Sequence, residues 1–248
     1  MKKKHLITRR KLIVSGLTAV GSALMLPGCN RPMPPTYGNI LRMGDALTYL
    51  AHRTLLPGQS LAMEYDIRDI SSMPATGTTN PGDTSLPTYS EEYSRLHFGG
   101  FADWRLTIEG SVSHPGSYTL LDLQKFPART QVTRHTCEEG WTAITQWTGV
   151  PLSLLLQSAG IKPEAQFVNF HTFDGWKDSI DLYDAFHPQT IIAYGMNGKD
   201  LPVAHGAPVR LRVEKQIGYK SFKYINKIVV TNEFADQGDI GWAWYTGI

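Results

Sequence analysis

Hydrophobic and polar residues alternate in short stretches through the second half of the chain, and this alternation predicts a sheet-rich domain. A period of two residues is typical of a strand with one buried face. Glycine and turn dipeptides such as Asn197-Gly198 separate the stretches. We predict strands at residues 104–110, 131–136, 167–172, 190–194, 209–213 and 224–230.

Short helices are predicted between these strands from their capping residues. Thr119 is followed three residues later by Asp122, which is the pattern of a capping box. Pro151 and Gly160 bracket an apolar run, as proline and glycine do at the two ends of a helix. A third short helix is predicted at 181–186. The fold class is therefore α+β, with mixed sheets and short helices.

The region before residue 89 gives weaker signals. Residues 30–35 form a proline-rich tether, and residues 40–56 have the pattern of a short helix. Residues 73–87 are rich in Pro, Gly, Thr and Ser, which predicts a long irregular loop. We divide the chain after the leader into a tether and irregular segment, 30–88, and a domain, 89–248.

Residues 1–29 have the pattern of an export signal. Basic residues precede an uncharged run, 12–26, that is too short and too rich in small residues to span a membrane. Residues 8–12 (TRRKL) match the twin-arginine pattern, with an ordinary secretory signal as the alternative. The leader ends in LPGC, which resembles a lipobox. We predict a periplasmic protein, either lipid-anchored at Cys29 or cleaved nearby and untethered.

Without the leader the chain is acidic and has one cysteine. The leader holds six of the 24 Lys/Arg and none of the 22 Asp/Glu, so its removal changes the formal net charge from +2 to −4. We therefore predict no nucleic-acid partner, since that needs clustered basic residues. Cys137 cannot form an internal disulfide, although exported proteins commonly use them. The twin-arginine route carries folded proteins, so we predict a metal at Cys137, inserted before export.

The flanks of Cys137 set the chemistry of its thiol. Arg134 and His135 would favour the reactive thiolate, whereas Glu138 and Glu139 would oppose it. No cluster of zinc ligands surrounds this cysteine in the sequence. A single thiolate points to a metal whose other ligands come from a sulfur-bearing organic cofactor. The alternative is a buried cysteine that only fills the core.

A second group of residues suits a phosphate-bearing cofactor. Residues 205–210 (HGAPVR) and 218–223 (GYKSFK) combine basic side chains, a hydroxyl and glycine-exposed amides. We predict that Arg210 and Lys223 contact phosphate. The remaining basic residues are predicted to be strand-end charges that face solvent: Arg212, Lys215 and Lys220.

Four ordered motifs resemble the sulfite oxidase-fold family of molybdopterin-dependent oxidoreductases. They are WRLTIEG (104–110), CEEGW (137–141), WTGVPL (147–152) and HGAPVR (205–210), the last continuing to Lys223. The similarity covers about residues 89–233. It implies a mononuclear molybdenum centre with one pterin, in which Cys137 ligates molybdenum beside the two pterin dithiolene sulfurs. It also implies that these residues bind the cofactor: Ser94, Arg95, Thr172, His205, Arg210, Ser221, Phe222 and Lys223.

The resemblance also implies a reaction and partners. The metal would cycle between states two electrons apart while an oxygen atom passes to or from a small S-oxide or N-oxide substrate. Electrons would be exchanged with a membrane haem protein, because this chain has no CxxCH motif. Sulfite oxidases of the family carry arginines where Glu138 and Glu139 stand, which disfavours sulfite. The family's methionine sulfoxide reductases have Asn in place of His205. We expect a monomer, because little chain follows Glu233.

Three alternatives remain at this point. The same site could oxidise a sulfite-type substrate. The domain could be a non-catalytic, lipid-anchored pterin-binding module. A cysteine hydrolase would pair Cys137 with His171 or His205 as its base.

Overall fold

The computed structural model describes residues 60–234, together with residues 47, 50, 51, 54 and 55. The export signal, the lipobox, the tether and the tail at 235–248 lie outside the described residues. Of the helix predicted at 40–56, the five described positions are helical. Among the described residues, no helix has the length and apolar character needed to cross a membrane.

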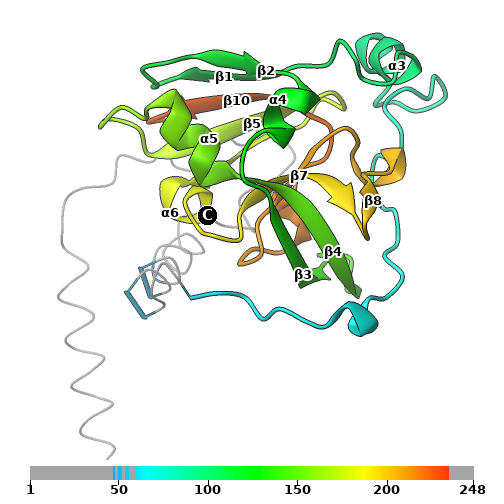
Figure 1. Ribbon diagram of the computed structural model, residues 1–248, viewed down its shortest axis with the longest axis horizontal. Helices are drawn as coiled ribbons and strands as arrows, with labels where there is room; N and C mark the ends of the chain where they lie inside the picture. The colour runs from blue at the N-terminus through cyan, green and yellow to red at the C-terminus, as the bar shows by residue number, and fades with distance from the viewer. Residues whose placement is uncertain (1–46, 48–49, 52–53, 56–59, 235–248) are drawn as a thin grey trace, which may run out of the picture. The chain divides into compact units, whose positions relative to one another are not determined.

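Two five-stranded sheets form the described domain (Figure 1). The first sheet has the order β2-β1-β10-β5-β6, and within it β1 and β10 run parallel whereas the other neighbours are antiparallel. Its strands are β1 (Leu106–Gly110), β2 (Gly116–Tyr118), β5 (Phe167–Thr172), β6 (Lys177–Asp181) and β10 (Ile225–Thr231).

The second sheet is antiparallel and has the order β3-β4-β7-β8, with β9 also paired to β7. The long β3–β4 hairpin, in the lower part of Figure 1, is its largest element. The strands are β3 (Arg129–Thr136), β4 (Thr142–Pro151), β7 (Ile191–Met196), β8 (Lys199–Asp200) and β9 (Arg210–Arg212).

The short helices begin and end where their capping residues predict. Helix α4 (Leu120–Gln124) has a capping box, in which the Thr119 hydroxyl accepts from the amide of Asp122 at 2.9 Å. Helix α5 (Leu152–Ala159) follows Pro151 and ends at Gly160, whose φ of 69° is the left-handed conformation that glycine adopts easily. Asp181 caps α6 (Leu182–Ala185). The remaining helices are α3 (Glu91–Phe98) and the 3₁₀ turns η2 (Ile67–Asp69), η3 (Val203–His205) and η4 (Gly218–Lys220).

The predicted fold class is confirmed, and all six predicted strands are present, but the sequence did not predict β2, β4, β6, β8, α3 or the 3₁₀ turns. Strand β4 alternates buried and exposed positions as expected, yet its buried residues include Ala143 and Thr145, which are small or polar. A hydrophobic pattern therefore does not reveal this strand. Strand β6 buries Asp178 and Ser179, and for the same reason its sequence does not look apolar.

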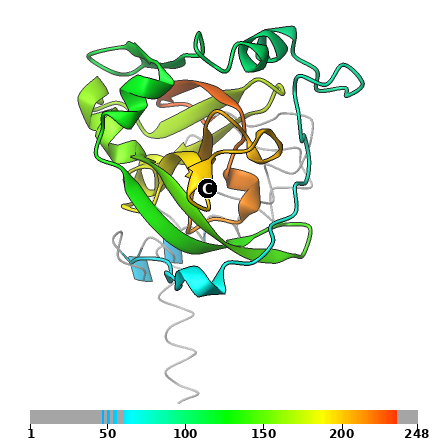
Figure 2. The same ribbon diagram turned by 45° about the vertical axis from the view of Figure 1, so that its right-hand side comes forward.

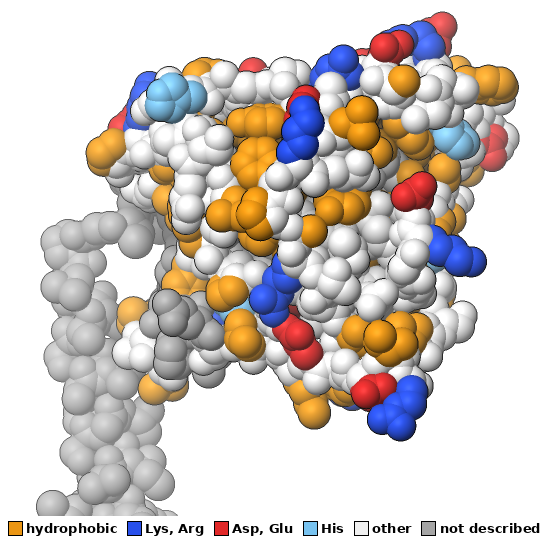
Figure 3. All heavy atoms as spheres, viewed as in Figure 1, with side chains coloured by type: hydrophobic (Ala, Val, Ile, Leu, Met, Phe, Trp, Pro, Cys, Tyr) orange, Lys and Arg blue, Asp and Glu red, His pale blue; other side chains and the backbone are white. Residues whose placement is uncertain are grey.

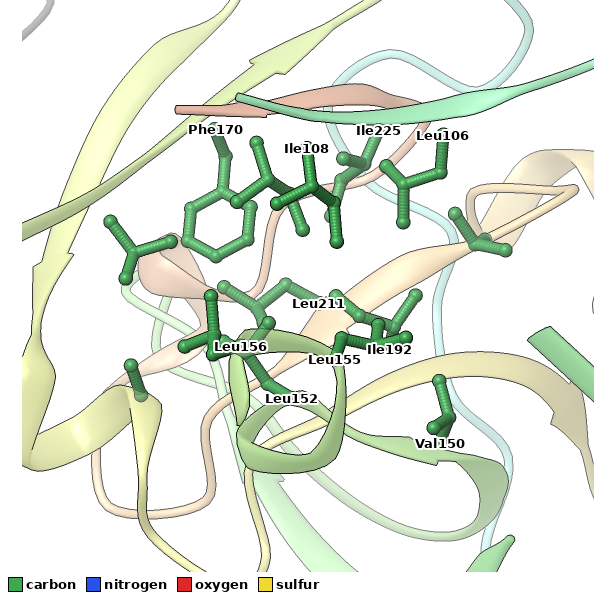
Figure 4. Close-up of a cluster of buried hydrophobic side chains, with 14 of the residues drawn as sticks. Leu106, Ile108, Val150, Leu152, Leu155, Leu156, Phe170, Ile192, Leu211 and Ile225 are labelled. Atoms are coloured by element: carbon green, nitrogen blue, oxygen red, sulfur yellow. The ribbon is translucent and has the colours of Figure 1, made fainter. Parts of the chain in front are cut away.

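The main core lies between the two sheets and around α5. In Figure 4, side chains of the first sheet, such as Ile108 and Phe170, point toward those of α5 and of the second sheet. Leu155 of α5 and Leu211 of β9 are fully buried. Full burial of such a side chain stabilises the fold by about 1.5–3 kcal/mol. This core fixes β9 and the loops at its ends relative to β5 and β10.

Residues 60–90 pack along the outside of the domain up to α3 (Figure 2). Glu64 forms an isolated antiparallel β-bridge with Thr133 of β3, and the amide of Ser71 donates to the carbonyl of Ile144 on β4 at 2.9 Å. The predicted irregular character of 73–87 is confirmed. The residues just before this segment are held by backbone bonds to the β3–β4 hairpin, and residues of 73–78 form one wall of a cavity.

The surface around the core carries both signs of charge. On the face shown in Figure 3, Lys and Arg side chains are interspersed with Asp and Glu, often side by side. Lys125 and Asp122 of α4 form one such exposed pair at 2.7 Å. Exposed pairs of this kind contribute little to stability.

Candidate functional site

A cavity of about 470 Å³ brings together most of the residues predicted to bind the cofactor. Its walls are the β3–β4 loop, the start of the β5–β6 turn, η3, β9, η4 and the segment from 73 to 78. This volume suits a small-molecule or cofactor pocket. The predicted residues that line it are Cys137, Thr172, His205, Arg210, Ser221, Phe222 and Lys223.

Ser94 and Arg95 are placed elsewhere. They lie on helix α3, where Ser94 is half-buried and Arg95 is exposed, and neither lines the cavity. The upstream wall is formed instead by a segment that sequence reasoning treated only as an irregular loop: Met73, Pro74, Thr76, Gly77, Thr78 and Thr88. Its Thr and Gly content gives no chemical signal, so no pattern would have found it.

Cys137 is the first residue of the loop that joins β3 to β4. Its amide donates to the carbonyl of Trp141 at 2.9 Å, and Gly140 closes the turn with φ of 89°. The Cys137 side chain is 7% exposed, and its Sγ donates to Oε2 of Glu138 at 3.5 Å. Burial, with a contribution from Glu138, raises the pKa of the thiol. The free protein therefore disfavours the thiolate.

The positive charge expected beside the thiol is not supplied by its neighbours in sequence. Arg134 is exposed and its guanidinium lies over the ring of Tyr65, 5.2 Å from the centroid. Burial and the nearby arginines lower the pKa of His135 to about 2, so that imidazole is neutral. A metal cation bound at this position would stabilise the thiolate.

The arrangement does not support a cysteine hydrolase. Among the described residues, no hydrogen bond joins Cys137 to His171 or to His205. His171 lies on β5 and does not line the cavity. A nucleophilic thiol requires a base in contact with it, and neither histidine provides one here.

Arg210 supplies a buried positive charge with unused hydrogen-bonding capacity. Its Nη1 donates to the carbonyl of His205 at 3.0 Å and its Nη2 to the carbonyl of Ser221 at 2.7 Å. Its Nε has no partner among the described residues. Burial, followed by the charge of Arg212, lowers the pKa of Arg210 to about 9. A buried guanidinium in this condition favours an anionic ligand.

Lys223 adds a second cation to the lining of the cavity. Its Nζ donates to the carbonyls of Thr76 at 2.8 Å, Ala204 at 3.3 Å and Thr78. Burial and then the charge of Arg210 lower the pKa of Lys223 to about 8. Lys223 thus joins the 73–78 wall to η3 and adds positive charge to the cavity.

Two basic residues expected to face solvent are buried instead, so that prediction was wrong. Arg212 forms an ion pair with Glu214 at 2.9 Å, and Lys220 forms one with Asp178 at 3.0 Å. Both ion pairs are buried, because β9 and η4 turn inward toward the core rather than ending at the surface. Lys215 is half-buried and donates to the hydroxyl of Tyr183 at 3.4 Å.

Two groups next to the cations complete the polar lining. The Thr172 hydroxyl donates to Oδ1 of Asp174 at 2.5 Å, and burial raises the pKa of that carboxyl. Burial, Arg210 and Lys223 together lower the pKa of His205 to about 4. His205 is therefore neutral at physiological pH and adds no positive charge to that of Arg210 and Lys223.

These residues fit a molybdenum–pterin cofactor with an anionic phosphate. The unsatisfied Nε of Arg210 is a donor suited to a phosphate oxygen. Among the described residues, no group of three His, Cys, Asp or Glu side chains could hold a metal ion by itself. The donor set is thus one thiol, which suits a metal whose other ligands are brought by an organic cofactor.

The family of the chain was tested by sequence comparison. The sequence profile of the family described as "Oxidoreductase molybdopterin binding domain" matches residues 97–238, more than half of the chain. A protein of Azospira oryzae, whose name proposes a protein-methionine-sulfoxide reductase subunit (YedZ1), is 40% identical over 59% of this chain and 56% of its own length. The methionine-sulfoxide reductase catalytic subunit MsrP of Campylobacter jejuni is 34% identical over 53% and 50%.

Two further comparisons extend the similarity. MsrP of Xanthomonas campestris is 29% identical over 89% of this chain and 69% of its own length. The crystal structure of the sulfane dehydrogenase SoxCD of Paracoccus pantotrophus superposes with a TM-score of 0.51 and 26% identity, covering 54% of this chain and 39% of that one. The chain spans about half the length of the first two relatives. It belongs to the sulfite oxidase family of molybdopterin-binding oxidoreductases, whose cofactor is molybdenum–molybdopterin.

Proposed function

We propose that this chain transfers oxygen atoms at a molybdenum centre bound in the cavity, in the direction of S-oxide reduction. The observation that carries the proposal is that the cavity lining holds one thiol, Cys137, and a buried cation, Arg210, that has no carboxylate partner among the described residues. The names of the MsrP relatives support a sulfoxide substrate. An N-oxide is the second substrate class to test.

Each lining residue has a role that follows from its chemistry. Cys137 would ligate molybdenum as a thiolate, and Arg210 and Lys223 would neutralise the cofactor phosphate. The remaining four residues would hold the pterin through hydroxyl, imidazole and aromatic contacts: Thr172, His205, Ser221 and Phe222. When bound, the cofactor supplies the two-electron chemistry that exchanges an oxygen atom with the substrate.

The protein's contribution is binding, charge and exclusion of water. The 73–78 wall, which Lys223 joins to η3, covers the cavity on the side of the cations. Trp141 also lines the cavity, and its indole N–H donates to Oε2 of Glu139 at 3.0 Å. The pocket therefore combines buried cations suited to the phosphate with an acidic rim next to the thiol.

The acidic rim bears on which substrates can approach. Glu138 and Glu139 are exposed, line the cavity and stand beside Cys137. Two carboxylates repel an anion such as sulfite but do not repel a neutral sulfoxide. This supports sulfoxide reduction over sulfite oxidation as the reaction of the site.

Electron supply and location complete the proposal. A sulfoxide needs two electrons and two protons to become a sulfide and water, and we propose a membrane haem protein as the electron donor. Export by the twin-arginine route to the periplasm, with or without a lipid at Cys29, would place the chain beside such a partner. The export route and the lipid site rest on the sequence of residues 1–29, whereas the haem partner rests on the family resemblance.

The proposal is tested by producing the full chain in cells that make the cofactor. The wild-type protein is expected to carry molybdenum and to oxidise a reduced viologen dye when dimethyl sulfoxide or methionine sulfoxide is added. Cys137→Ser is expected to lose that activity. Molybdenum without sulfoxide- or N-oxide-dependent dye oxidation would favour the non-catalytic module. Sulfite-dependent ferricyanide reduction exceeding sulfoxide reduction would reverse the proposed direction.

A further inference from the structure

A buried ion pair between Arg212 and Glu214 lies next to a residue of the cavity lining, His135. The side chains of Arg212 and Glu214 are 1% and 0% exposed, and their Nη2 and Oε2 atoms are 2.9 Å apart. Gln131 also donates to Oε1 of Glu214 at 2.9 Å. Burying two charges costs about as much as their attraction returns, so such a pair adds little net stability. Its position next to the cavity suggests that it orients another group.

That group is His135. Nη1 of Arg212 is in hydrogen-bond contact with Nδ1 of His135, and Arg212 also lies over the Trp147 ring at 4.7 Å. A guanidinium carries only donors, so the imidazole must accept at Nδ1. A neutral imidazole that accepts at Nδ1 carries its proton on Nε2. Arg212 therefore selects one tautomer of His135.

The Nε2 edge of this imidazole packs against Gly218, a residue of the cavity lining. His135 lines the cavity and stands two positions before Cys137 in the chain. A Cβ at Gly218, which lines the same cavity, would be only 2.6 Å from Nε2 of His135, so only glycine allows the ring to stand there. The centroids of the His135 and Trp141 rings are 5.4 Å apart. Among the described residues, the hydrogen-bond contact of the His135 ring is the one that Nδ1 makes with Arg212.

We propose that His135 donates a hydrogen bond from Nε2 to an acceptor atom of the pterin, and that Arg212 is the positioning residue that fixes this tautomer. Neither residue is among those that the family resemblance implies. A neutral donor adds a hydrogen bond without adding charge to a cavity that already holds Arg210 and Lys223. It can therefore orient the pterin while leaving the balance of charge with the phosphate unchanged.

The tautomer is measured directly by long-range ¹H–¹⁵N spectra of the histidine rings, in which His135→Gln identifies the His135 signals. The expected result is a protonated Nε2 and an unprotonated Nδ1 in the cofactor-free protein, with the Nε2–H signal shifting when cofactor is loaded. In Arg212→Met/Glu214→Leu, which removes both charges together, the two tautomers should be mixed. A protonated Nδ1 in the wild type, or an unchanged Nε2–H signal on loading, would overturn the proposal.

A matched pair of variants tests the hydrogen bond itself. The amide of Gln can donate from nearly the position of Nε2, whereas Leu cannot. His135→Leu is expected to lose molybdenum at least about 10-fold faster than wild type during dialysis, with His135→Gln close to wild type. The thermal unfolding of both cofactor-free variants serves as control. If Gln and Leu lose molybdenum equally fast, the residue acts only through packing.

This inference rests on the proposed assignment of the cavity to the cofactor. Different results would refute the cofactor assignment and the role of His135. Wild-type protein that never carries molybdenum would refute the assignment of the cavity to the cofactor. Protein that carries molybdenum, but whose His135 signals do not respond to it, would remove only the role of His135.

Discussion

Arg210 and Arg212 stand two positions apart on β9, are both buried and both lie over Trp147, at 5.1 and 4.7 Å, yet their charges have different surroundings. Arg212 forms an ion pair with Glu214. Arg210 donates only to two backbone carbonyls and leaves its Nε without a partner among the described residues. One charge is balanced within the fold, and the other is available to a ligand.

This difference separates a structural role from a binding role more reliably than residue type does. From the sequence alone the two arginines look alike, since both alternate with apolar residues on one strand. The presence or absence of a carboxylate within contact distance decides which of them can neutralise an anion.

The largest effect is expected at Arg212. Arg212→Met leaves Glu214 buried without its ion-pair partner, so the free energy of unfolding should fall by about 3–5 kcal/mol. Urea denaturation of the cofactor-free protein measures it. Adding Glu214→Leu should restore most of the loss, because no charge is then left buried. Equal instability of the single and double variants would mean that Arg212 acts through its size and not through its charge.

Arg210 should behave in the opposite way. Arg210→Met removes an unbalanced buried cation, so the stability of the cofactor-free protein should be unchanged or rise by about 1 kcal/mol. Molybdenum content, measured by elemental analysis, should fall about 10- to 100-fold, because the phosphate loses its buried cation. A variant that keeps wild-type molybdenum would show that the free Nε of Arg210 is not a phosphate donor.

The pH dependence of the free energy of unfolding should reveal the effect of Arg210 and Lys223 on the pKa of His205. Its folded pKa, about 4, lies below the value of about 6.5 for an unfolded histidine. The unfolded chain therefore binds more protons between these values, and stability should fall as pH drops from about 6.5 to about 4. Because the ring is about half exposed, we expect a loss of about 1–2 kcal/mol. Urea denaturation of wild type and His205→Gln at both ends of this window checks it, and parallel losses in the two proteins would contradict it.

The smallest effect is expected at the acidic rim. Glu138→Gln removes one exposed negative charge beside Cys137, so the ratio of sulfite oxidation to sulfoxide reduction should rise about 2- to 5-fold at low salt. Steady-state assays with both substrates measure the ratio, and Asp200→Asn, an exposed change on β8, is the control. An unchanged ratio would mean that the rim does not select substrates by charge.

The sequence predicts elements whose pattern is carried by a few residues. The capping box of Thr119 and Asp122 and the Pro151–Gly160 bracket specify α4 and α5, and both are confirmed. The motifs around Cys137 and Arg210 predicted residues that the fold brings to one cavity. These signals are local in the sequence, so they can be recognised without knowledge of the tertiary structure.

The parts that escaped prediction depend on long-range contacts. Arg212 is buried in contact with Glu214 and His135. The positions of these three residues in the sequence do not reveal that they are in contact. The 73–78 wall has no chemical signature, and it becomes part of the site only because Lys223 binds its carbonyls. The ion-pair partner of a buried residue and the segments that line a cavity are determined by tertiary packing. The hydrophobic pattern along the chain does not reveal them.

Molybdenum K-edge X-ray absorption on the purified protein tests the central claim most directly. We predict that wild-type molybdenum has the two dithiolene sulfurs and one further sulfur, from Cys137, in its coordination shell, and that Cys137→Ser loses that further sulfur while keeping the metal. An identical sulfur count in both proteins would contradict the account, because the thiol at the edge of the cavity would then not be a ligand.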